Sequence, residues 1–123
     1  MSPRLHHYDP TAEYKEPFVG DKFSSVMYAD AAVKFLSERK KNDRPFFAFV
    51  AFTSPHDPRN QHPGYGHTYH PEEMELPVSY LPQHPFDNGE LKIRDEVLLP
   101  FPRTEEMIRK DLADYYGMIS EVD

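Results

Sequence analysis

The residues with the clearest capacity for chemistry lie in a short turn, Pro-His-Asp-Pro-Arg, at residues 55–59. Pro55 and Pro58 each fix their own φ angle and restrict the residue before them, so His56 is held with little backbone freedom left to lose. A histidine changes charge near neutral pH, so a fixed imidazole donates to an anion or transfers a proton. His56 is therefore the candidate catalytic residue. The structural alternative, a hydrogen bond from its ring to a nearby carbonyl, is equally common.

Asp57 and Arg59 flank this histidine and are candidate substrate-binding residues. Arginine suits bidentate recognition of an anion, although a surface ion pair is the more common arrangement for such a pair. A zinc site formed by several histidines of the chain is a weaker hypothesis, because no carboxylate or cysteine accompanies these histidines at a spacing typical of zinc ligands. The histidines of this zinc alternative are His56, His62, His67 and His70. Three tyrosines of the same connection are candidates either to stack on sugar rings or to pack the loop against the body: Tyr65, Tyr69 and Tyr80.

The element that must position this turn is the apolar run FFAFVAF at residues 46–52. It shows no polar alternation, which is typical of a central strand buried on both faces by helices. In open α/β sheets, ligands bind beyond the carboxyl ends of the strands. The fold class predicted is therefore α/β, with the histidine turn at the carboxyl end of a parallel strand.

Two helices are predicted on either side of this strand. Residues 24–41 have apolar side chains at steps of three and four, with Ser24 or Ser25 as N-cap and basic residues at the end. Residues 104–122 repeat this spacing, with Thr104 as N-cap and Glu105 and Glu106 in the first turn. The expected apolar faces are Val26, Ala29, Val33 and Leu36 for the first helix, and Ile108, Leu112, Tyr115 or Tyr116, Ile119 and Val122 for the second.

The remaining chain is predicted to be a surface lead-in at residues 1–21 and a long connection at residues 53–103. That connection holds nine of the 13 prolines and five of the seven histidines. An ordered connection of this length usually lines a functional surface, so we expect it on the active-site side. The whole chain, 123 residues, is of the size of one small domain with a modest core.

Charge and composition exclude several classes of function. The net charge of −7 comes without clustered Lys and Arg, which argues against nucleic-acid binding. The absence of cysteine excludes disulfides, thiolate metal sites and an encoded cysteine nucleophile in this chain. The first residues lack the apolar core of a signal peptide, and the run at 46–52 is too short to span a bilayer, so no membrane contact is expected.

Two stretches of the chain resemble the type I sulfatases. Residues 20–59 read GDKFSSVMYADAAVKFLSERKKNDRPFFAFVAFTSPHDPR, which is similar to the family's Asp-Ala-Ala helix, Pro-Phe-Phe strand and Pro-His-x-Pro turn. Residues 111–123, DLADYYGMISEVD, resemble the helix that follows in that family. The resemblance spans about residues 28–123, and its motifs are moderately specific together and weak singly.

This resemblance implies a central fragment of a formylglycine-dependent sulfuric ester hydrolase with the alkaline-phosphatase-like α/β fold. It implies a small-molecule or carbohydrate sulfate ester as substrate, and His56 close to the sulfate and the ester oxygen. In the family, formylglycine is the nucleophile and calcium or a similar cation neutralises the sulfate. By analogy the compartment is periplasmic or extracellular.

The chain departs from the family pattern in its nucleophile and metal ligands. The family's [Cys/Ser]-x-Pro-x-Arg motif is missing, since Ser2-Pro3-Arg4 has the wrong spacing. Asp87-Asn88-Gly89 is better interpreted as a tight turn than as a metal motif, so no metal ligand is predicted. The partner expected is therefore the remainder of a sulfatase domain, and the chain alone should be inactive. The alternatives are a stand-alone acidic protein-interaction module and a phosphodiesterase or phosphonate hydrolase of the same superfamily.

Overall fold

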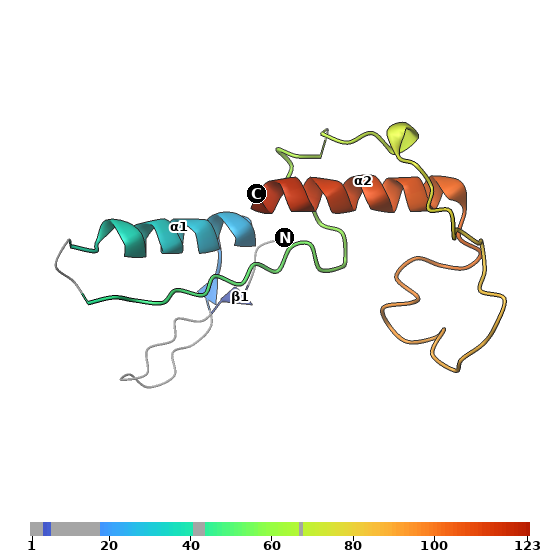
Figure 1. Ribbon diagram of the computed structural model, residues 1–123, viewed down its shortest axis with the longest axis horizontal. Helices are drawn as coiled ribbons and strands as arrows, with labels where there is room; N and C mark the ends of the chain where they lie inside the picture. Colours follow the sequence, from blue (N-terminus) through green and yellow to red (C-terminus); the bar gives the residue numbers. More distant parts are fainter. Residues whose placement is uncertain (1–3, 6–17, 41–43, 67) are drawn as a thin grey trace. The chain divides into compact units, whose positions relative to one another are not determined.

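The computed structural model describes residues 4–5, 18–40, 44–66 and 68–123. The chain divides into two compact units, Met1–Thr53 and Ser54–Asp123. The boundary between these units falls between the apolar run and the histidine turn, and the expected single sulfatase segment over residues 1–123 stays a prediction. The elements in order are β1 (Arg4–Leu5), β2 (Phe18–Val19), α1 (Ser24–Ser37), the 3-10 helix η1 (Pro71–Glu73) and α2 (Glu105–Val122), as Figure 1 shows.

The first unit contains β1, β2 and α1. β1 and β2 pair antiparallel, with Arg4 opposite Val19 and Leu5 opposite Phe18. The predicted helix at 24–41 begins where expected and ends four residues early, at Ser37. Its N-cap is Phe23 without a side-chain hydrogen bond, so the predicted serine cap is wrong.

Side-chain contacts explain both ends of α1. The Ser24 hydroxyl lies 3.3 Å from the Thr53 hydroxyl instead of capping the helix. At the other end, the Ser37 hydroxyl donates to the Lys34 carbonyl at 2.8 Å. Beyond the helix, Arg39 donates to the Arg44 carbonyl at 2.8 Å and so connects the end of α1 to the chain that follows.

Residues 44–53 run back along α1 in an extended conformation (Figure 1). The predicted buried strand at 46–52 is not formed, since these residues belong to no β-ladder and most of them are exposed. A strand needs neighbouring strands to pair its backbone groups and layers to cover its faces. Of the described residues, β1 and β2 pair with each other and not with residues 46–52. Val33 of the predicted apolar face of α1 is 64% exposed, whereas Leu36 of that face lines the side next to the extended residues. Tyr28, Ala32 and Phe35 line the same side.

The second unit is organised around α2. Thr104 is its N-cap and accepts from the Met107 backbone N–H at 3.2 Å, which confirms the predicted cap. The buried residues of α2 are Ala113, Gly117 and Met118, which lie beside the predicted apolar face. In the described part of the chain the buried hydrophobic side chains are Ala113 and Met118, so the expected modest core is not present there.

Residues 54–103 form the predicted long connection, interrupted by η1, which packs on α2. Arg109 of α2 donates to the carbonyl of Met74, just after η1. A second loop closes at its base, where the Arg103 N–H donates to the Pro82 carbonyl at 2.8 Å and the Tyr80 hydroxyl donates to the Arg103 carbonyl at 2.5 Å. Neither described helix is long and apolar enough to cross a membrane.

Candidate functional site

His56 lies at the start of the second unit with 70% of its side chain exposed. Its Nδ1 atom is 2.7 Å from the backbone carbonyl oxygen of Asp57. Because a carbonyl only accepts hydrogen bonds, Nδ1 must carry the proton. The other nitrogen, Nε2, is then a proton acceptor in the neutral ring and a donor only in the imidazolium. The structural alternative, a hydrogen bond from the ring to a carbonyl, is therefore present, and the catalytic role of His56 stays a prediction.

The carboxylate of Asp57 is held in its ionised form. Its own backbone N–H is the main cause that lowers the pKa of Asp57, and Arg59 adds a hydrogen bond and its charge, while burial opposes them. Arg59 Nη1 lies 3.1 Å from Oδ1 of Asp57. The same carboxylate oxygen is 4.0 Å from Nδ1 of His56, so a protonated imidazole forms an ion pair with it.

Arg59 connects the histidine turn to α2. Its Nη1 donates to the Pro55 carbonyl at 3.2 Å, and its Nε lies 3.7 Å from Oδ2 of Asp111. The guanidinium carbon lies 5.1 Å from the centre of the Tyr115 ring. Only 25% of the Arg59 side chain is exposed, and its planar group is used for contacts within the second unit. The structure therefore favours the ion-pair role for Asp57 and Arg59; binding of substrate by these two residues stays a prediction.

Gln61, His62 and Tyr69 continue this attachment along α2. The contacts are polar, and each joins a loop residue to a side chain of α2 that follows Asp111 in the sequence. Sequence reasoning missed this set, although Asp111, Asp114 and Glu121 recur at helical spacing. The three contacts are Gln61 Nε2 to Asp114 Oδ1 at 2.8 Å, the His62 N–H to Glu121 Oε2 at 2.9 Å, and the Tyr69 hydroxyl to the Ser120 hydroxyl at 2.9 Å.

A cavity of about 330 Å³ adjoins the turn. Its charged lining contains four carboxylates and two guanidinium groups, so its net charge is negative and it disfavours a sulfate anion. Arg103 is occupied there by Glu96, at 3.1 Å. An anionic ligand is therefore better accommodated at the exposed edge of His56 than inside this cavity. The lining residues are Asp57, Pro58, Arg59, Asp95, Glu96, Leu98, Leu99, Arg103, Ile108 and Asp111.

The described residues do not form a metal centre. They contain no group of three or more histidine, aspartate or glutamate side chains with the geometry to hold a metal ion. His67 of the weighed zinc set lies outside the described residues, and Nδ1 of His62 accepts from the Gly64 N–H at 3.0 Å. Zinc binding by these histidines has no structural support in this part of the chain.

The Asp87-Asn88-Gly89 sequence forms a turn, as predicted. Asp87 Oδ1 accepts from the Gly89 N–H at 2.8 Å, and Asn88 Oδ1 accepts from the Glu90 N–H at 3.1 Å. Gly89 has a φ of +84°, a conformation that favours glycine. Calcium needs six to eight oxygen ligands, and two exposed side chains that cap a turn do not fit such a site. Ser2 and Pro3 of the rejected nucleophile motif lie outside the described residues.

Stacking of the three tyrosines of the connection on sugar rings stays a prediction. The hydroxyl groups of Tyr69 and Tyr80 form hydrogen bonds within the second unit, with the Ser120 hydroxyl and the Arg103 carbonyl. The side chain of Tyr65 is 37% exposed. Three further arginines of the second unit form ion pairs: Arg94 with Asp95 at 2.6 Å, Arg103 with Glu96 at 3.1 Å, and Arg109 with Glu105 at 3.9 Å.

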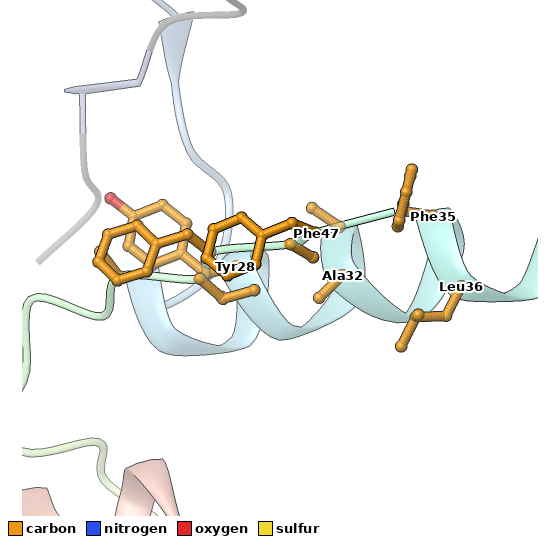
Figure 2. Close-up of a pocket in the computed structure, with 10 residues that line it drawn as sticks. Tyr28, Ala32, Phe35, Leu36 and Phe47 are labelled. Carbon is orange, nitrogen blue, oxygen red and sulfur yellow. The ribbon is translucent and has the colours of Figure 1, made fainter. Parts of the chain in front are cut away.

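The first unit contains an apolar groove of about 610 Å³ that the sequence did not predict (Figure 2). It lies between α1 and the extended residues, and its wall is largely aromatic and aliphatic. Phe47 is 89% exposed and Phe49 is 82% exposed at this surface. The groove is lined by Tyr28, Ala31, Ala32, Phe35, Leu36, Phe47, Ala48, Phe49, Val50 and Ala51.

Comparison with protein-family models, with curated proteins and with solved structures gave no match for this chain. The sulfatase resemblance therefore rests on the sequence stretches at residues 20–59 and 111–123.

Proposed function

We propose that this chain is part of a sulfuric ester hydrolase of the sulfatase class and that His56 contributes to its sulfate site. The observation that carries the proposal is the state of His56. Its ring is 70% exposed, its Nδ1 proton is held by the Asp57 carbonyl, and its turn is attached to α2 through Arg59. An imidazole fixed in this way is suited to a developing charge on an ester oxygen.

In this proposal the imidazolium of His56 donates from Nε2 to a sulfate or ester oxygen. Nδ1 cannot do so while its proton is held by the Asp57 carbonyl. The Asp57 carboxylate, 4.0 Å from Nδ1, stabilises the charged ring. The substrate class is an organic sulfate ester; aryl, carbohydrate and choline sulfates all carry the oxygen that this nitrogen would contact.

The nucleophile and the cation of the sulfatase reaction would come from the remainder of the domain. Formylglycine supplies the attacking hydroxyl in the sulfatase class, and calcium neutralises the sulfate. The described residues of this chain do not fit a calcium site, as shown above, and the chain has no cysteine. The chain's own contribution is therefore to hold and orient His56.

The exposure of the apolar run supports a larger domain. Phe47 and Phe49 are almost completely exposed, which is costly in water for two aromatic side chains two positions apart on one extended segment. In an α/β sheet, strands on either side would pair the backbone of residues 46–52, and a second layer would cover these rings. The histidine turn would then lie at the carboxyl end of the strand, where α/β enzymes bind ligands.

The test begins with the DNA on both sides of this coding segment. We expect an in-frame [Cys/Ser]-x-Pro-x-Arg motif upstream and further acidic metal ligands. The encoded protein should then hydrolyse an aryl sulfate in calcium and hydrolyse the matching aryl phosphate much more slowly. Preference for the phosphate would instead indicate the phosphodiesterase or phosphonate hydrolase alternative. Stop codons on both sides with no such motif would leave the interaction-module alternative.

Two variants of that longer protein test the role of His56. His56→Ala should lower kcat by about 100-fold or more, the usual effect of losing a general acid. His70→Ala is the matched control, because His70 is an exposed histidine of the same connection and should leave kcat unchanged. The 123-residue chain by itself should release no phenol above the blank, and turnover by it would contradict the proposal that the nucleophile lies elsewhere.

A further inference from the structure

Asn88 and Gly89 lie in an exposed turn of the second unit. Residues 85–90 are all exposed, so water reaches this turn. A Cβ atom placed on Gly89 would meet none of the described residues within 4 Å. The main-chain nitrogen of Gly89 therefore has no side chain of its own and no neighbour at that position to keep a reacting group away. The carboxamide carbon of the preceding residue, Asn88, is an electrophile within reach of this nitrogen.

One hydrogen bond orients the Asn88 carboxamide for reaction. Asn88 Oδ1 accepts from the Glu90 N–H at 3.1 Å. This bond closes a loop of atoms that includes the Gly89 nitrogen, so the side-chain carbon of Asn88 is held over the main chain beside that nitrogen. The donor at Oδ1 also stabilises the negative charge that this oxygen gains when a nucleophile adds to the carboxamide.

A second hydrogen bond restrains the nucleophile. Asp87 Oδ1 accepts from the Gly89 N–H at 2.8 Å. The nitrogen attacks only after it loses this proton, and a carboxylate that accepts from the N–H favours its protonated form. The negative charge of Asp87 further opposes an anion on the nitrogen. A carboxylate is a weak base beside a main-chain amide anion, so Asp87 retains the proton at Gly89 instead of removing it.

We propose that Asn88 is a site of spontaneous covalent modification by the Gly89 nitrogen and that Asp87 restrains its rate. In the first step a bond forms between the Gly89 nitrogen and Cγ of Asn88. The bond from Cγ to Nδ2 breaks, and Nδ2 leaves as ammonia with the proton that left the Gly89 nitrogen. Water then opens the resulting succinimide at either carbonyl, which gives aspartate or isoaspartate at position 88. Water is the only co-reactant, and the inference does not depend on the proposed sulfatase function.

Either product changes the loop at residue 88. Both add a negative charge to a chain whose net charge is already −7, and isoaspartate also adds a carbon atom to the main chain. The hydrogen bonds that close the base of the loop join Arg103 to Pro82 and Tyr80, and they do not involve Asn88. The change should therefore stay local, and circular dichroism should show the same helix content before and after conversion.

The first test uses the native chain and an asparagine within it as control. Asn60 is also exposed, but it precedes Gln61, whose side chain donates to Asp114 at 2.8 Å. After incubation in isotopically labelled water at mildly alkaline pH, peptide mass spectrometry should show label at residue 88. We expect conversion there to be about tenfold faster than at Asn60, because glycine alone leaves the attacking nitrogen uncovered. The product should be a mixture of aspartate and isoaspartate.

Two results of this test would overturn the proposal. Conversion of Asn88 no faster than that of Asn60 would show that the turn gives it no special reactivity. Aspartate as the sole product would indicate direct attack by water on the carboxamide, because opening of a succinimide gives both isomers.

The second test changes the two neighbours of Asn88. Gly89→Ala covers the nitrogen and disfavours the φ of +84°, so conversion should slow by about tenfold. Asp87→Ala frees the Gly89 N–H and should speed conversion by about threefold or more. Asp95→Ala is the matched control, because Asp95 pairs with Arg94 at 2.6 Å and its loss removes the same charge from the same connection. This control should convert at the native rate.

The variants separate the site from its restraint. An unchanged rate in Gly89→Ala would contradict attack by the Gly89 nitrogen. A slower rate in Asp87→Ala would show that Asp87 removes the proton and would overturn its restraining role. Equal acceleration in Asp87→Ala and Asp95→Ala would assign the effect to the overall charge of the loop, against a specific role for the hydrogen bond from Gly89.

Discussion

Gln61 and Gly117 lie so close that a Cβ atom at residue 117 would be 1.9 Å from Oε1 of Gln61. The same glutamine donates through Nε2 to Asp114 Oδ1 at 2.8 Å, one turn earlier on α2. Because glycine has no side chain, the loop that follows the histidine turn can lie directly on the helix at Gly117. Because this loop continues from Arg59, the contact contributes to the position of His56.

Gly117→Ala should release this loop while strengthening the helix. Alanine is favoured over glycine inside a helix by about 1 kcal/mol, and the displaced hydrogen bond of Gln61 costs a similar amount. We expect little net change in the free energy of unfolding and faster amide hydrogen exchange at residues 60–62. Gly66→Ala is the control, because its Cβ would meet nothing closer than 3.7 Å. Unchanged exchange at these amides would show that Gln61 adapts without leaving α2.

Arg59→Lys should loosen the histidine turn even though the charge is kept. A lysine has no planar group to reach Pro55, Asp57 and Asp111 together, so we expect a loss of about 1 kcal/mol in the free energy of unfolding, allowing for partial exposure. The chain should also show a lower order parameter at the His56 amide. Arg94→Lys is the control, since Arg94 forms only an exposed ion pair with Asp95. Equal effects of the two changes would argue against a special role for Arg59.

The stability of the chain should depend on the ionisation of Asp57 in acid. The pKa of Asp57 is lowered from its ordinary value of 3.8, chiefly by its own backbone N–H and then by Arg59. A lowered pKa means that the carboxylate stabilises the folded chain above 3.8, and that this contribution is lost as the pH falls through the folded value. The difference in free energy of unfolding between the native chain and Asp57→Asn should therefore shrink below this pH. A difference that grows in acid would contradict the sign.

Thr104→Ala should destabilise the start of α2. Thr104 accepts a hydrogen bond from the Met107 N–H at 3.2 Å, and loss of an N-cap costs about 1 kcal/mol. Thermal unfolding followed by circular dichroism should show a lower midpoint and a lower total helix content, because the first turn at residues 105–107 loses its cap. Thr104→Ser keeps the accepting oxygen and should restore most of the loss. Equal midpoints for the alanine and serine variants would mean that Glu105 and Glu106 suffice to start the helix.

The two helices were predictable because their signals are local. The start of α1 at Ser24 follows from the periodicity of its apolar residues. The cap of α2 at Thr104 follows from capping chemistry within a few residues. The end of α1 was missed, since the contact of Arg39 with the Arg44 carbonyl joins residues on either side of a turn. The faces of the two helices were predicted only in part, because the spacing of apolar side chains shows a stripe along a helix without showing which residues of the stripe are covered.

The sequence by itself determined that the chain has a rigid histidine turn after a seven-residue apolar run, that Asn88-Gly89 is a turn, and that no cysteine is available. Proline geometry, the φ preference of glycine and side-chain chemistry decide these points without any long-range contact. Only the tertiary structure decided that Arg59 reaches Asp111 and Tyr115, that Gln61 lies on Gly117, and that Phe47 and Phe49 are exposed. Those features depend on residues far apart in the chain, and burial depends on what the rest of the molecule places over a surface.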